Sequence, residues 1–182
     1  MSASDLPLSA QLAVNDFALF DLPQRFAQNR AEIDSRWKDL QRQAHPDKFA
    51  NQGTAAQRVA MQWSVRINEA YQRLKDPLRR AAYLCELAGA AIQAENNTAM
   101  PAAFLMQQMT WREALDEATD LATLEALHDQ VNQAYQERLH ECEHCIDVVH
   151  DLSQAAQAVR ALMFIERFAR DIEQRLDALD PS

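Results

Sequence analysis

Two short stretches of the sequence combine residue types that could do chemistry. His140, Glu141 and His144 form an H-E-x-x-H pattern within a segment of helical periodicity. Two histidines four residues apart lie on one helix face and can bind zinc, with the glutamate as the general base of a hydrolase. Cys142 and Cys145 add a single C-x-x-C pair. Taken alone, the stretch is compatible with a helical zinc hydrolase or with adventitious metal binding.

The surroundings of this stretch argue against a catalytic metal. No glycine and third histidine follow at the metzincin spacing, and no second C-x-x-C completes a four-ligand zinc site. A third ligand such as Glu166 would have to come from the next helical segment. We therefore expect no enzymatic activity, no metal and no cofactor, and we interpret the stretch as a solvated, partly core-facing helix. Cys85 is expected to be a buried apolar packing residue.

The second stretch, Ala44-His45-Pro46-Asp47-Lys48, interrupts two long helical patterns. Proline disfavours the helical conformation of the residue before it, so the first helix should end near His45, and Pro46 should stiffen the loop. The carboxylate of Asp47 is suited to a bidentate contact with an arginine of a partner. His45 could cap the end of its helix or contact the partner. The loop could therefore be a docking point or a simple connector.

The elements that must position these residues are helices. The chain is 48% hydrophobic and 25% charged, has two glycines, and is rich in residues of high helix propensity. Asp16, Asp120 and Ser153 are predicted N-caps, and Pro23 is expected to end the first helix. The predicted fold is all-α, an N-terminal helical hairpin with short flanking helices followed by an antiparallel three-helix bundle. The expected helices cover residues 16–23, 29–44, 54–75, 78–88, 101–118, 121–149 and 153–179.

The distribution of charge indicates two modules with different partners. Residues 1–88 hold 12 Lys/Arg and 10 Asp/Glu, whereas residues 89–182 hold 6 and 17. We predict domains at 1–88 and 100–182, joined by a connection at 89–99. Nucleic-acid binding is not expected, because phosphate neutralisation requires clustered cations. No membrane-length apolar run and no secretion signal are visible, so the expected location is the cytoplasm, with no membrane partner.

Cations precede the His-Pro-Asp loop. Arg36, Lys38 and Arg42 lie largely off the apolar stripe of their helix, and Lys48 follows the turn. Such a basic face is usually a solvated surface, but this one leads directly into the loop. It is therefore predicted to steer the module towards an acidic partner surface with a salt-sensitive association rate.

The order and spacing of several segments resemble a J-domain. These are Phe17–Pro23, the basic helix, His45–Phe49, Ile67–Leu74 and Asp76–Leu84. The resemblance implies binding to an Hsp70-class ATPase and stimulation of its ATP hydrolysis. Ala44 departs from the pattern, because many J-domains have an aromatic residue there.

The helix that begins near Pro101 has two apolar faces. At about 100° per residue, the core stripe and a second stripe lie roughly opposite each other. A methionine stripe is more often part of the core than a binding site. This one, however, is followed by two carboxylates, an arrangement typical of a partner-binding surface with a polar rim. The core stripe is Phe104, Trp111, Leu115 and Ala118; the second is Met106, Met109, Glu113 and Glu117, with Leu105 at its edge.

The same helix extends the resemblance to the HscB family of J-domain co-chaperones of iron–sulfur cluster assembly. The matching segments are Phe104–Met109, Arg112–Glu117, Leu40–Gln43 and His45–Ala50, with Phe164 in the last helix. The resemblance implies that the bundle binds an IscU-like scaffold and presents it to an HscA-like Hsp70. A general J-protein for unfolded clients remains the alternative. The implied scaffold-binding residues are Leu105, Met106, Met109, Glu113, Glu117 and Phe164, and the implied chaperone-binding residues are Arg36, Lys38, Arg42, His45, Pro46, Asp47 and Lys48. Thr110 departs from the pattern, because an acid stands there in a relative.

Overall fold

The computed structural model describes residues 13–49, 53–90, 92 and 100–179. These residues form helices and their connections, with no strand among them, and no helix in them is long and apolar enough to span a membrane. The chain divides into two compact units, the first ending at Leu84 and the second beginning at Cys85. This division falls within one helix, four residues before the predicted domain end at residue 88.

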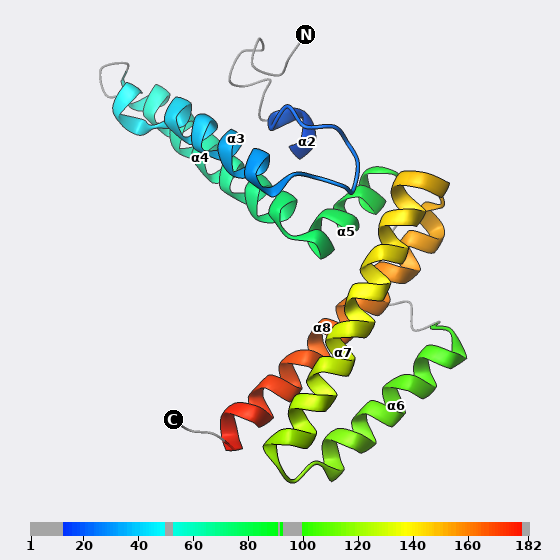
Figure 1. Cartoon of the computed structure of the whole chain (residues 1–182). Coiled ribbons are helices and arrows are strands. Elements are labelled where there is room, and N and C mark those ends of the chain that lie inside the picture. Colours follow the sequence, from blue (N-terminus) through cyan, green and yellow to red (C-terminus); the bar gives the residue numbers. More distant parts are fainter. Residues whose placement is uncertain (1–12, 50–52, 91, 93–99, 180–182) are drawn as a thin grey trace. The chain divides into compact units, whose positions relative to one another are not determined.

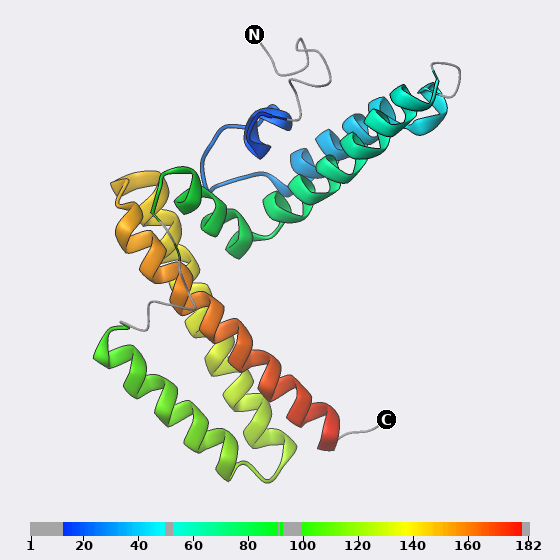
Figure 2. The same cartoon turned by 180° about the vertical axis from the view of Figure 1, so that it is seen from behind.

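The first unit is built on a helical hairpin. α3 (Arg30–Ala44) and α4 (Thr54–Lys75) lie side by side in Figures 1 and 2. Asn29 caps α3 by accepting hydrogen bonds from the Ala31 and Glu32 amides, and Ala44 is fully buried at its other end. Both ends of α4 match the sequence prediction. α5 (Pro77–Leu87) follows after Asp76, whose side chain accepts a hydrogen bond from the Arg79 amide.

The short helix α2 (Asp16–Leu19) corrects two predictions. It ends four residues before Pro23, at a turn in which Asp21 takes a φ of 51°. Its N-cap is Asn15, whose side chain accepts a hydrogen bond from the Ala18 amide, and not Asp16. Both Asn and Asp are favoured at this position, so the sequence did not separate the two neighbours.

Asp16 instead forms the buried ionic centre of the first unit. Its carboxylate is inaccessible to solvent and lies 2.6 Å from a guanidinium nitrogen of Arg66 and 3.0 Å from one of Arg73. Its amide donates to the hydroxyl of Tyr83, and the Arg73 guanidinium lies 4.8 Å from the centre of the Tyr83 ring. Both arginines are on α4 and Tyr83 is on α5, so one buried acid ties α2 to two other helices.

The second unit is a three-helix bundle of α6 (Ala102–Glu117), α7 (Leu121–His144) and α8 (Leu152–Leu179). Asp120 caps α7 as predicted, but Asp151, not Ser153, accepts the hydrogen bond from the Gln154 amide at the start of α8. The expected helix to residue 149 changes its winding, because Cys145–Val149 form a π-helical turn. His150, which follows that turn, has a left-handed backbone conformation with a φ of 59°.

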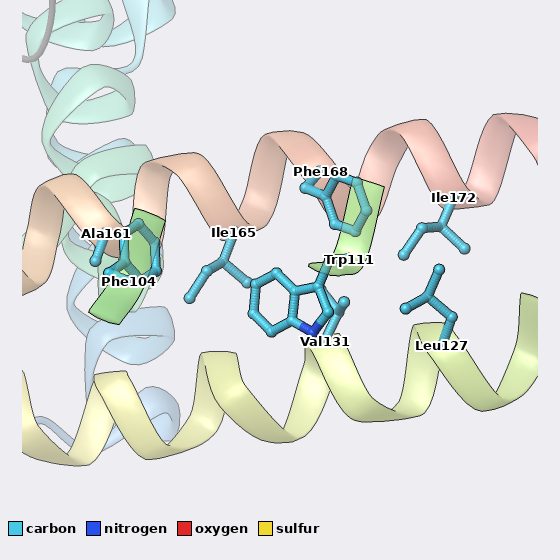
Figure 3. Packing of buried hydrophobic residues seen from close by; sticks show 8 residues of the cluster. All are labelled: Phe104, Trp111, Leu127, Val131, Ala161, Ile165, Phe168 and Ile172. Atoms are coloured by element: carbon cyan, nitrogen blue, oxygen red, sulfur yellow. The ribbon is translucent and has the colours of Figure 1, made fainter. Parts of the chain in front are cut away.

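The core of the bundle lies between all three helices. Figure 3 shows Trp111 of α6 reaching between Val131 of α7 and Phe168 of α8. The Trp111 and Phe168 rings are stacked, with centroids 5.9 Å apart. The core-facing stripe predicted for α6 is confirmed, since Phe104, Trp111 and Ala118 are buried and Leu115 is partly buried.

Candidate functional site

The His-Pro-Asp loop of the first unit presents a carboxylate to solvent. α3 ends at Ala44, and His45 adopts an extended conformation, as expected for a residue before proline. Pro46–Phe49 then form one short 3-10 turn, in which the Lys48 amide donates to the His45 carbonyl. The Asp47 side chain is 88% exposed. The backbone therefore holds this acid in a defined turn without burying its charge.

The His45 ring contacts Asp47. Its Nδ1 lies 3.3 Å from the Asp47 amide nitrogen and 3.4 Å from the carboxylate Oδ2. A neutral Nδ1 without hydrogen accepts from the amide, whereas a protonated Nδ1 pairs with the carboxylate. The sequence left open whether His45 caps its helix or contacts a partner. In the structure its backbone forms the C-cap of α3, and its side chain contacts Asp47.

The basic face of α3 is more nearly neutral than its sequence indicates. The Arg36 guanidinium lies 3.2 Å from the Asp21 carboxylate and 3.8 Å from that of Glu32. Arg42 is paired with Asp39 one turn earlier. Lys38 and Lys48 are exposed beside these pairs. Steering of a partner by this face should therefore be weaker than four unpaired cations would produce.

The second unit carries an exposed apolar surface on α6. Leu105, Met106 and Met109 are 44%, 69% and 62% exposed, although the opposite face of the same helix is buried in the core. Glu113 and Glu117 are exposed on the turns that follow. The hydroxyl of Thr110 donates to the Met106 carbonyl, so it is partly engaged by its own helix. Five of the six predicted scaffold-binding residues therefore lie on one solvent-facing stripe.

Phe164, the sixth residue, extends this surface onto α8. It is partly buried against the core, and its ring meets that of Phe104 edge to face, with centroids 6.1 Å apart. The guanidinium of Arg112 lies 5.9 Å from the centre of the Phe164 ring. We refer to Leu105, Met106, Met109, Glu113, Glu117 and Phe164 together as the α6 surface.

The H-E-x-x-H stretch does not assemble a metal centre from the residues that the structure describes. These residues contain no group of three His, Cys, Asp or Glu side chains that could hold a metal ion. The Glu141 carboxylate lies 2.5 Å from the Arg138 guanidinium, so its charge is already paired. His140 Nδ1 lies 2.9 Å from the Gln136 carbonyl one turn earlier. The Glu141 and His140 side chains are thus each engaged within their own helix.

The three cysteines are buried thiols. Loss of solvent on burial is the main cause that raises the pKa of Cys85 to about 11 and that of Cys142 to about 12, and it also raises the pKa of Cys145. The interpretation of Cys85 as a buried packing residue is confirmed, since its side chain is inaccessible. Neither C-x-x-C sulfur is exposed for exchange chemistry.

We expect a thiol reagent at pH 8 to label the folded chain at least ~100-fold more slowly than the chain unfolded in guanidinium, because burial suppresses the thiolate and its access. The measurement is the rate of release of the coloured thiol from an aromatic disulfide reagent. A variant with one added surface thiol, Ser153→Cys, is the positive control for reagent activity. Rapid labelling of any of the three native thiols in the folded chain would contradict this burial.

Comparison with known proteins identifies relatives along nearly the whole chain. The family model "HSCB C-terminal oligomerisation domain" matches residues 100–173. The "Co-chaperone protein HscB homolog" of Cupriavidus taiwanensis is 47% identical over 176 residues, 95% of this chain and 99% of that protein. That of Burkholderia thailandensis is 46% identical over 167 residues, 90% of this chain and 95% of that protein.

Solved structures extend the similarity to three dimensions. Chaperone HscB from Vibrio cholerae is 34% identical, covers 91% of this chain and 99% of its own, and has a TM-score of 0.78. The human co-chaperone protein HscB is 24% identical over 90% of this chain and 82% of its own, with a TM-score of 0.84, which shows a shared fold. The hairpin of the first unit is thus a J-domain. The chain belongs to the HscB family of co-chaperones, which acts in iron–sulfur cluster assembly.

Proposed function

We propose that this co-chaperone binds an IscU-like scaffold through the α6 surface and an HscA-like Hsp70 through the His-Pro-Asp loop, and that it stimulates the ATPase of the Hsp70. The chain itself needs no catalytic residue for this task. Holding both partners at once raises the effective concentration of the scaffold at the chaperone. The domains, by this proposal, are residues 1–88 for the chaperone and 100–182 for the scaffold.

The exposed α6 surface is the observation that carries this proposal. Periodicity alone would have favoured a second core stripe, but both methionines are more than half exposed. Flexible thioethers adapt to irregular partner surfaces, and the flanking carboxylates supply a polar rim. The chaperone side of the proposal rests on the exposed, backbone-positioned carboxylate of Asp47, which suits a bidentate arginine.

We expect the double substitution Met106→Ala/Met109→Ala to weaken scaffold binding roughly 10- to 100-fold, because truncation of central apolar contacts removes most of an interface's affinity. The measurement is calorimetric titration of the full chain with the iron–sulfur scaffold of the same organism. Both side chains are exposed, so helicity and the unfolding midpoint should change little.

A matched control substitutes two other exposed apolar residues of the second unit, Val148→Ala/Val149→Ala. This variant should bind the scaffold as the wild type does. Equal loss in both double variants would contradict a specific α6 site.

Two competing occupants of the α6 surface give different results in the same variants. Preferential loss of binding to a denatured model protein would favour a general J-protein for unfolded clients. Loss of self-association in sedimentation, with scaffold binding intact, would instead make the α6 surface a contact between copies, as the word "oligomerisation" in the matched family description suggests.

A further inference from the structure

Arg112 lies at the edge of the α6 surface and has a free charge. We infer that Arg112 determines specificity at this surface by pairing with an acidic side chain of the bound scaffold, an inference that rests on the function proposed above. Arg112 is exposed, and no ion pair in the described part of the chain involves it. In the described structure its guanidinium carbon lies over the Phe164 ring, 5.9 Å from the ring centroid.

Two other arginines of this unit have their charges paired within the described structure. Arg138 pairs with Glu141 and Arg170 pairs with Glu166, each within its own helix. Asp116 is four residues after Arg112, the spacing at which an acid and a base meet on a helix. No ion pair joins these two described residues, and the guanidinium is turned to the Phe164 ring instead.

The position of the guanidinium over the Phe164 ring leaves it able to bind a carboxylate. A flat guanidinium over an aromatic ring, within about 6 Å of its centroid, is attracted through its face. Its N–H groups lie in the plane of the fork, so they stay available to a carboxylate in a bidentate arrangement. Phe164 thus positions the charge of Arg112 where a partner covering the α6 surface would meet it.

The helical spacing places opposite charges on the two sides of the surface. Arg112 follows Leu105 by seven residues, about two turns, so it continues the Leu105 side of the stripe. Glu113 and Glu117 continue the side of Met109 and Met106, whereas the exposed Asp116 lies between the two sides, about 40° around the helix from Arg112. The α8 side gains a second exposed cation from Arg167, three residues after Phe164.

This division of charge describes the partner. An apolar centre with a basic edge at Phe164 and an acidic edge at Glu113 and Glu117 fits a scaffold surface that carries an acid and a base on opposite sides of an apolar patch. Only one orientation of such a partner pairs both edges, because the reversed orientation places like charges together.

The test is the charge reversal Arg112→Glu in the full chain, titrated with the iron–sulfur scaffold of the same organism. Scaffold binding should weaken about 10-fold or more, since placing like charges together at an interface is strongly unfavourable. Added salt should reduce the difference in scaffold affinity between the variant and the wild type, because salt screens the new repulsion. Arg112→Met retains an unbranched side chain over Phe164 without the charge. Its affinity for the scaffold should lie between those of the wild type and Arg112→Glu.

The matched control is Arg170→Glu, which makes the same charge reversal on a different helix, α8. Arg170 lies about 120° around that helix from Phe164, away from the α6 surface. This variant should bind as the wild type does. Binding of Arg112→Glu equal to that of Arg170→Glu, or an affinity gap independent of salt, would overturn the inference while leaving the proposed function intact. Absence of scaffold binding by the wild-type chain would overturn both.

Discussion

Asp47→Asn should abolish stimulation of the Hsp70 ATPase and leave scaffold affinity unchanged. The substitution retains the size of the side chain and removes the charge that we propose to meet an arginine of the chaperone. A bidentate ion pair is lost with that charge, and truncating one partner of such a pair typically costs ~2–5 kcal/mol, enough to weaken the productive complex ~30-fold or more. Because the side chain is 88% exposed, the fold should not change.

The measurement is steady-state ATP hydrolysis by the HscA-like chaperone of the same organism, at saturating scaffold, with increasing co-chaperone. Glu69→Gln, which neutralises another exposed acid of the first unit, should stimulate as the wild type does. Simultaneous loss of chaperone stimulation and scaffold binding in a folded Asp47→Asn protein would contradict the proposed division of labour between the two units.

Asp16→Asn should destabilise the first unit by about 2–4 kcal/mol. Removing one member of a buried ion pair leaves the remaining charge uncompensated, at a typical cost of ~3–5 kcal/mol. The Arg66 and Arg73 side chains are 19% and 36% exposed, so water can solvate them in part, which places the expected loss towards the lower end.

Guanidinium denaturation followed by circular dichroism of the full chain measures this effect. The first unit should unfold at lower denaturant, while scaffold binding by the second unit persists. Asp21→Asn is the matched control, because it removes an acid of the same segment whose pair with Arg36 is solvent-exposed, and it should cost ~0–1 kcal/mol. A loss below ~0.5 kcal/mol for Asp16→Asn would show that the buried pair contributes nothing net.

Local features of the fold were readable in the sequence because they depend on neighbours. Pro46 ended α3 through a steric effect on the residue before it. The bounds of α4 and the cap of α7 at Asp120 followed from periodicity and capping chemistry. The prediction of Ser153 as the cap of α8 was wrong, because Asp151, two residues earlier, accepts the capping hydrogen bond. Helix ends are commonly misplaced by one or two residues.

Contacts between residues far apart in the chain could not be predicted from the sequence. Asp16 meets Arg66 and Arg73 across 50 and 57 residues of chain, and nothing in its own neighbourhood distinguishes it from an N-cap. The basic appearance of α3 was corrected for the same reason, since Arg36 is paired with Asp21 across a turn. The contact between the Arg112 guanidinium and the Phe164 ring joins two helices, and neither segment alone predicts it.

The sequence by itself determined that this chain is helical, where its long helices lie, and which family it resembles, because helix periodicity, proline sterics and motif spacing are local properties. Only the tertiary structure decided which apolar stripe of α6 is core and which is surface, since burial depends on what the other helices cover. The packing of Phe104 and Trp111 against α8 turns Met106 and Met109 outwards.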